Sequence, residues 1–271
     1  MTITFIRKFP VAIYFGLTFF ISWTGAFLLV ANKIIKNEPI TTLDGILMFP
    51  IMLLGPVISG ILMNYALGKR SAVRELFGRM KLSRTKNAWL LSLLIPPLLI
   101  FIALLALSVF ISKEYEPGFF LMGILFGIPA GFLEELGWMG FAFPQMIRFR
   151  SAFNSSIVLG LIWSVWHLPV INFLGAASPH GSYWFIYFLS FATVMTAMRV
   201  IIAWVYVNSH SLLLCQLLHI SSTGFLVVFS PSPISGQHEP VWYFFYALLL
   251  WVLVGMIYYK YGKNLVRKSS L

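Results

Sequence analysis

Residues 119–143 of this chain read FFLMGILFGIPAGFLEELGWMGFAF. About 20 apolar residues suffice to cross a bilayer as a helix, so this stretch predicts a membrane span, yet it contains two adjacent carboxylates, Glu134 and Glu135. An ionisable side chain near the bilayer centre costs at least ~2.5 kcal/mol, and such residues usually face the protein interior and carry function. The stretch therefore predicts a buried polar site inside a membrane protein.

The composition agrees with a membrane location. The 271 residues are 59% hydrophobic and only 10% charged, whereas soluble domains contain roughly 25% charged residues. No polar stretch is long enough for a soluble domain, so we predict one all-α integral-membrane domain over residues 1–271. The single cysteine, Cys215, excludes an internal disulfide framework and a thiolate zinc cluster. Apolar runs predict about eight transmembrane helices, over residues 9–31, 45–68, 88–112, 118–143, 155–177, 182–207, 211–230 and 240–260.

The charged residues are distributed unevenly between the connections. If successive connections alternate between two sides, one side receives fifteen Lys and Arg residues with one acid, and the other receives three with five acids. Basic residues in short loops stay inside, so both termini are expected in the cytoplasm. The net charge of +11 is then a topology signal that also favours contact with anionic membrane lipids, and no nucleic-acid partner is expected.

Further ionisable residues lie at a similar depth in other apolar segments. At 1.5 Å per residue, Glu134 lies about 15 Å and His167 about 18 Å from the cytoplasmic ends of their segments. His219 and Arg199 lie about 12 Å deep. Unrelated structural residues have no reason to share a depth, so we predict one site in the cytoplasmic half of the bilayer. The other histidines fall in loops or at segment ends, where we expect them at the surface: His180, His210 and His238.

Small residues spaced by four indicate how the two glutamates differ. Gly123, Gly127 and Gly131 form the pattern that lets membrane helices approach closely. Glu135 continues this stripe and should point into the tight helix interface, in a structural or electrostatic role. Glu134 is rotated by about 100°, and we expect it to be the chemical residue.

Two neighbours support the histidines. Trp163 lies one turn before His167 and should restrict the orientation of the imidazole, and Thr223 lies one turn after His219. A threonine hydroxyl can donate to an oxyanion or hold a water molecule, although Thr223 suits helix packing equally well.

The residue types at this level suit amide hydrolysis. The only aspartate, Asp44, lies in a predicted loop, so an aspartyl-protease dyad is excluded. Neither a His-Glu-x-x-His helix nor a Gly-x-Ser-x-Gly elbow is present near the site. A buried glutamate beside a second carboxylate makes a good general base for water. His167 and His219 can stabilise the oxyanion, or bind a divalent metal such as zinc with Glu134 as the third ligand, and both alternatives stay open.

The stretch 134–141, EELGWMGF, followed by Pro144, resembles the first signature of the CAAX-protease and bacteriocin-processing (CPBP) family. Residues 163–167 are similar to the family's aromatic-x-x-x-His motif, and residues 219–223 to its His-x-x-x-Asn motif, within a core of about 118–230. The resemblance implies a CAAX-type intramembrane metalloendopeptidase with a prenyl-protease-like helical bundle. It also implies that Glu134 activates water, that both histidines complete the site and that Thr223 aids the oxyanion.

Departures from the family pattern leave a second function open. Met139 stands at the position of the motif arginine, and Arg199 either supplies the missing cation to Glu135 or extends to the cytoplasmic surface. The favoured function is cleavage of membrane-associated peptides or proteins in the cytoplasmic half of the bilayer. Met139 favours the alternative, a non-enzymatic protein of bacteriocin self-immunity or a membrane adaptor. Proton-coupled transport would require half-helix repeats, which the sequence lacks.

Overall fold

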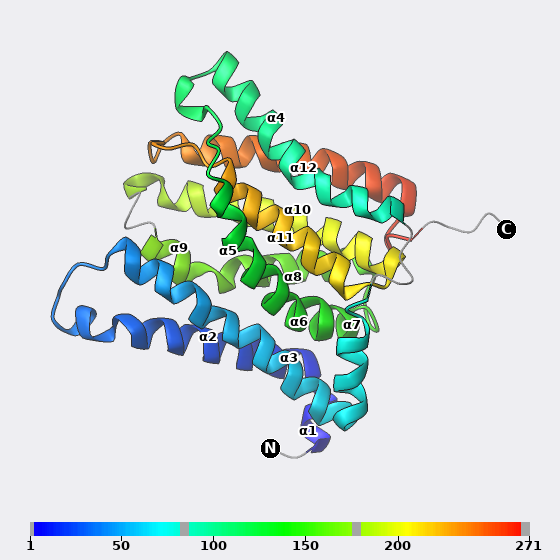
Figure 1. Ribbon diagram of the computed structural model, residues 1–271. Coiled ribbons are helices and arrows are strands. Elements are labelled where there is room, and N and C mark those ends of the chain that lie inside the picture. Colours follow the sequence, from blue (N-terminus) through cyan, green and yellow to red (C-terminus); the bar gives the residue numbers. More distant parts are fainter. Residues whose placement is uncertain (1–2, 82–86, 175–179, 267–271) are drawn as a thin grey trace.

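The computed structural model of the chain describes residues 3–81, 87–174 and 180–266. Within these ranges the chain is helical and forms no strand (Figure 1). Six of the described helical segments are long and apolar enough to cross a membrane, and two shorter apolar helices, Ala152–Trp166 and Leu212–Val228, account for the other two predicted segments. The predicted polytopic all-α membrane fold is confirmed.

The α-helices run in the order α1 (Ile3–Lys8), α2 (Pro10–Ile35), α3 (Thr42–Gly78), α4 (Ile95–Phe110), α5 (Ile124–Pro129), α6 (Glu135–Gly137), α7 (Phe143–Met146), α8 (Ala152–Trp166), α9 (Leu168–Leu174), α10 (Trp184–Ser209), α11 (Leu212–Val228) and α12 (Glu239–Tyr261). The 3₁₀ turns are η1 (Asn87–Leu94), η2 (Lys113–Tyr115), η3 (Leu121–Gly123) and η6 (Gly181–Tyr183). Two π-helical segments, η4 (Ala130–Glu134) and η5 (Trp138–Ala142), join α5, α6 and α7 into one irregular span.

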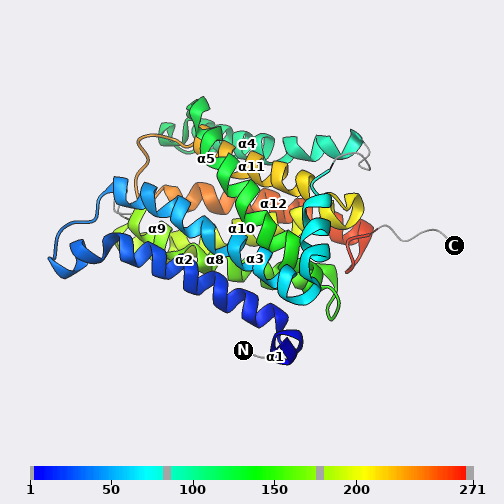
Figure 2. The same cartoon turned by 60° about the horizontal axis from the view of Figure 1, so that its bottom comes forward.

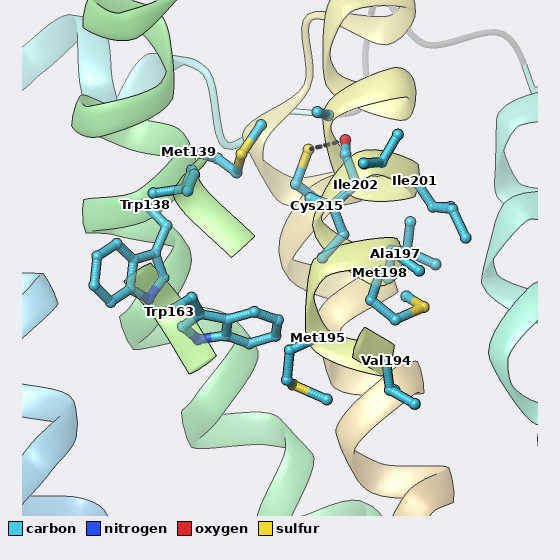
Figure 3. Packing of buried hydrophobic residues seen from close by; sticks show 14 of the residues in the cluster. Trp138, Met139, Trp163, Val194, Met195, Ala197, Met198, Ile201, Ile202 and Cys215 are labelled. Atoms are coloured by element: carbon cyan, nitrogen blue, oxygen red, sulfur yellow. Dashed lines mark hydrogen bonds between the residues drawn. The ribbon is translucent and has the colours of Figure 1, made fainter. Parts of the chain in front are cut away.

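Helix α10 forms the centre of the bundle and packs between α8 and α12. The antiparallel pair α2 and α3 lies along one side, and α4 lies beside α12 along the opposite side (Figures 1 and 2). Every residue from Val194 to Ala203 is buried, as expected for a helix that is apolar on all sides. Figure 3 shows Met195, Met198 and Ile202 of this helix within the core. The one charged residue of α10, Arg199, is therefore held inside the protein.

The predicted close approach of small residues is confirmed against α11. A Cβ atom added to Gly127 would lie 2.5 Å from the carbonyl oxygen of Ile220, and one added to Gly131 would lie 2.5 Å from that of Gln216. Only glycine lets the two backbones approach this closely. This packing brings the segment that carries the glutamates against the helix that carries His219.

The span predicted over 155–177 breaks at His167. Pro169 lacks the N–H that would continue the helix, and the His167 N–H bonds to the Ser164 carbonyl in a tighter turn. The Trp163 carbonyl thereby loses its helical partner, and His167 Nδ1 bonds to it at 2.8 Å. The break in the helix thus fixes the orientation of the imidazole.

The ends of the bundle differ in charge. Helix α2 begins and α12 ends at the same end of the molecule (Figure 1). The described parts of the basic connections predicted from sequence lie at this end, whereas the loop between α2 and α3 lies at the other. An even number of spans explains why both ends of the described chain lie together.

Candidate active site

Glu135 is the centre of a buried charge cluster. Its carboxylate lies 2.8 Å and 2.9 Å from Arg199 Nη1 and 2.7 Å from His219 Nδ1. All three side chains are at most 1% exposed, and they come from α6, α10 and α11. Of the two alternatives for Arg199, the structure therefore shows the contact with Glu135. Met139, at the position of the motif arginine, is fully buried in the apolar core (Figure 3).

Glu134 points to different partners. Its Oε2 atom accepts hydrogen bonds from the indole N–H groups of Trp138 at 3.0 Å and Trp163 at 2.6 Å, and the two indoles lie together in Figure 3. The divergence of the two glutamates agrees with the rotation predicted for adjacent helical residues, and the π-helical turns on both sides suit a functional segment. The sequence analysis missed the role of Trp138, although its i+4 spacing from Glu134 offered a signal.

Trp163 connects the whole cluster. Besides its bond to Glu134, its ring lies 4.1 Å from the Arg199 guanidinium carbon. The rings of His167 and His219 pack edge-on against it, with centroid separations of 5.2 Å and 5.1 Å. The ring provides a second stabilising contact for Arg199, whose Nε and Nη2 atoms have no hydrogen-bond partner among the described residues. Sequence reasoning expected this tryptophan only to orient His167.

The two imidazoles have their tautomers fixed in the same way. Nδ1 of His167 faces the backbone carbonyl of Trp163, and Nδ1 of His219 faces the Glu135 carboxylate. Both partners can only accept, so each Nδ1 carries the hydrogen. In the neutral form Nε2 is then a proton acceptor on both rings, which is how proteins prepare a histidine as a base or as a ligand.

A cavity of about 280 Å³ adjoins this cluster. Trp163, His167 and the half-buried Thr223 belong to its wall, whereas the other four predicted site residues do not. Glu134 is only 1% exposed, and Trp163 contacts both it and the cavity. In this conformation the indole of Trp163 therefore separates the glutamate from the space in which a substrate could bind.

The residues of the site do not fit a metal centre in this conformation. Nowhere in residues 3–81, 87–174 and 180–266 do three or more His, Cys, Asp or Glu side chains group in a way that could hold a metal ion. In the set predicted from sequence, Glu134 Oε2 already accepts two indole N–H bonds, and both imidazoles pack against the Trp163 ring. Metal binding by Glu134, His167 and His219 stays a prediction.

We expect the Glu135–Arg199 contact to be essential for folding. Arg199→Met leaves a carboxylate buried without its cation and should lower the free energy of unfolding by about 3–5 kcal/mol. Adding Glu135→Gln should restore part of this loss, because the uncompensated charge is removed. Unfolding in detergent gives the coupling energy of the double-mutant cycle. The exposed Arg148→Met is the control and should change stability by no more than about 0.5 kcal/mol, and strictly additive effects at the paired site would contradict the interpretation.

Comparison with known proteins agrees with this geometry. A family model described as type II CAAX prenyl endopeptidase Rce1-like matches residues 116–225, the part of the chain that contains every predicted site residue. The CAAX prenyl protease 2 of Methanococcus maripaludis is 30% identical over 239 residues, which cover 78% of this chain and 82% of that protein. The chain therefore belongs to the Rce1-like family of CAAX prenyl endopeptidases, and it is a membrane-embedded hydrolase of peptide bonds.

Proposed function

We propose that this protein cleaves membrane-associated peptides or proteins by attack of a water molecule that Glu134 deprotonates. The observation that carries the proposal is the convergence of Glu134, His167 and His219 on the single indole of Trp163, beside a cavity. A carboxylate and two imidazoles from three helices around one ring supply a base and proton carriers for hydrolysis.

Glu134 suits the role of the base. Both indoles donate to its Oε2 atom, which leaves Oε1 to take a proton. In the proposed reaction the water oxygen bonds to the scissile carbonyl carbon while Glu134 removes the proton. When the tetrahedral intermediate collapses, the C–N bond breaks and this proton passes to the leaving amine, which completes the hydrolysis.

The fixed tautomers refine the roles of the remaining residues. A neutral His167 presents a proton acceptor at Nε2, so it suits holding the water or relaying the proton better than donating to an oxyanion. The Thr223 hydroxyl on the same cavity wall is the donor for the oxyanion. Glu135 acts through His219, whose tautomer it holds.

Access to Glu134 requires Trp163 to move. Its ring lies on the cavity wall, and its N–H bonds to the glutamate. We propose that a bound substrate displaces the indole, so that a water molecule replaces the N–H on the carboxylate. Under this proposal, Glu134 is exposed to water only when a substrate fills the cavity.

The test of the base is Glu134→Gln. In detergent, with a library of membrane peptides, we expect this variant to lose at least ~10²-fold in kcat, because general-base catalysis contributes about 10²–10⁴-fold. The exposed Glu75→Gln is the matched control and should retain full activity. Cleavage that survives Glu134→Gln would contradict the mechanism. Peptide binding without turnover in both the unmodified chain and the variant would favour the alternative, an adaptor or a self-immunity protein.

The metal prediction has its own test. The mechanism above uses no metal, so treatment with 1,10-phenanthroline should leave peptide cleavage unchanged, and elemental analysis should find less than one zinc per chain. Loss of activity that Zn²⁺ restores, together with loss of bound zinc in His219→Ala, would instead favour the predicted set of Glu134, His167 and His219.

We also propose that both termini are cytoplasmic, because the basic connections gather at the end of the bundle where α2 begins and α12 ends. The cavity extends from His167 towards the other end, where its wall includes Phe49, Tyr187 and Leu226. Cytoplasmic termini therefore place a bound substrate in the outer half of the bilayer. We therefore propose a substrate in the outer half in place of the cytoplasmic half expected from sequence.

Labelling with a membrane-impermeant maleimide tests the orientation. Asn37 and Asn264 are exposed at opposite ends of the bundle, and the native Cys215 is buried. In intact cells we expect Asn37→Cys to react and Asn264→Cys to react only after the cells are opened. The reverse pattern would place the termini outside and the cavity in the cytoplasmic half.

A further inference from the structure

We propose that the far end of the cavity beside the candidate active site is a specificity subsite for a basic side chain, lysine or arginine, of the peptide substrate. The inference rests on the proposed peptidase function and adds a substrate preference to it. It concerns His180 and Glu239, which the mechanism does not use.

His180 and Glu239 form a second polar pair, in which the histidine is buried and the glutamate is partly exposed. His180 Nε2 lies 2.6 Å from Glu239 Oε2, and His180 is only 6% exposed. The expectation that this histidine lies at the surface is wrong, because the start of α12 and the Tyr187 ring cover it. Both members of the pair belong to the wall of the same 280 Å³ cavity that His167 and Thr223 line.

A continuous row of rings joins the two polar ends of this cavity. The His167 ring lies 5.4 Å from Phe191, and Phe191 lies 6.3 Å from Tyr243. Tyr243 lies 5.5 Å from Tyr187, which stacks on His180 at 3.8 Å with an interplanar angle of 12°. The cavity is therefore apolar and aromatic in its middle, with hydrogen-bonding groups at each end.

The charge of the far end favours a cation. The Glu239 carboxylate can only accept, so His180 Nε2 carries the hydrogen between them. The pair then has a net charge of −1 with neutral histidine and zero with protonated histidine, and it is never positive. The described cavity wall contains no lysine or arginine. The Glu239 carboxylate would repel an anionic side chain there, because no cation of the described wall would offset the repulsion. An ammonium or guanidinium group would instead form an ion pair with it.

The aromatic middle suits the stem of such a side chain. Tyr187 and Tyr243 lie on the cavity wall, and aromatic rings attract a nearby cation. Phe191 and Tyr187 lie one turn apart on α10, about 6 Å, which is within reach of the flexible four-carbon stem of lysine. A cavity of about 280 Å³ is slightly smaller than the usual range of ligand sites, about 300–1,000 Å³, and suits one or two residues rather than a large ligand.

Paired substrates test the subsite without changing the protein. For each position near the scissile bond, a set of three peptides would differ only at that position, which carries lysine, norleucine or glutamate. At one position we expect kcat/KM for the lysine peptide to exceed that for norleucine by about tenfold, the gain of a charge-assisted contact, and the glutamate peptide to be the poorest. Equal values for lysine and norleucine at every position would overturn the proposal.

The Glu239→Gln variant assigns the preference to the subsite. Glutamine can still accept the hydrogen bond from His180, so the fold should persist while the charge is lost. We expect the ratio of kcat/KM for the lysine peptide to that for the norleucine peptide to fall to about one, because the lysine peptide loses its charged partner. The control is Glu114→Gln, since Glu114 pairs with His238 at 2.8 Å but does not line the cavity. A lysine preference that survives Glu239→Gln, or that Glu114→Gln also abolishes, would overturn the proposal.

Binding separates this inference from the proposed chemistry. The same peptides, labelled with a fluorophore, would be titrated against the Glu134→Gln variant in detergent, and affinity read from fluorescence polarisation. Tighter binding of lysine than of norleucine supports the subsite even if no peptide is cleaved, in which case the proposed function alone fails. Equal binding overturns the subsite whatever the catalytic result.

Discussion

The buried contact between Glu135 and Arg199 is the constraint on which the rest of the structure depends. A lone charge inside a membrane protein is costly, and removing one partner of a buried pair leaves the other uncompensated. The contact therefore requires α6 and α10 to stay together, and His219 draws in α11 through the same carboxylate. Since α10 also packs against α8 and α12, most of the bundle is organised around this cluster.

Trp163 turns that structural cluster into a candidate site. Its ring stabilises Arg199 from one side and contacts both imidazoles, while its N–H donates a hydrogen bond to Glu134. A phenylalanine in this place would keep the ring contacts but could not donate the hydrogen bond. In the proposed mechanism, a movement of Trp163 would change both the hydrogen bonding of Glu134 and the shape of the cavity wall. Substrate binding and general-base catalysis would then depend on the same side chain.

The groups that line the cavity change along its length. Its wall carries the candidate chemical groups at one end, a row of aromatic rings in the middle and the His180–Glu239 pair at the other end. Each part combines residues of the stretch 163–191 with residues of the stretch 223–243, and in the proposed function each part would face a different region of a bound peptide. Hydrolysis, apolar contact and selection by charge can then act on one substrate together.

The sequence by itself determined the all-α membrane fold, the approximate positions of the eight apolar segments, although not the break at His167, and the convergence of Glu135, Arg199 and His219. It could do so because the cost of charge in hydrocarbon, and the close approach of glycine stripes, are local rules with few solutions.

Only the tertiary structure decided what surrounds these groups. The bond of the Trp163 indole to Glu134, the tautomer of His219 and the pairing of His180 with Glu239 depend on contacts between residues 29 to 84 positions apart. No local pattern states which faces of two helices meet, and a loop histidine looks the same in sequence whether water or a neighbouring ring covers it. Packing of the whole bundle settles such contacts, since each depends on the rotation and depth of both helices that form it.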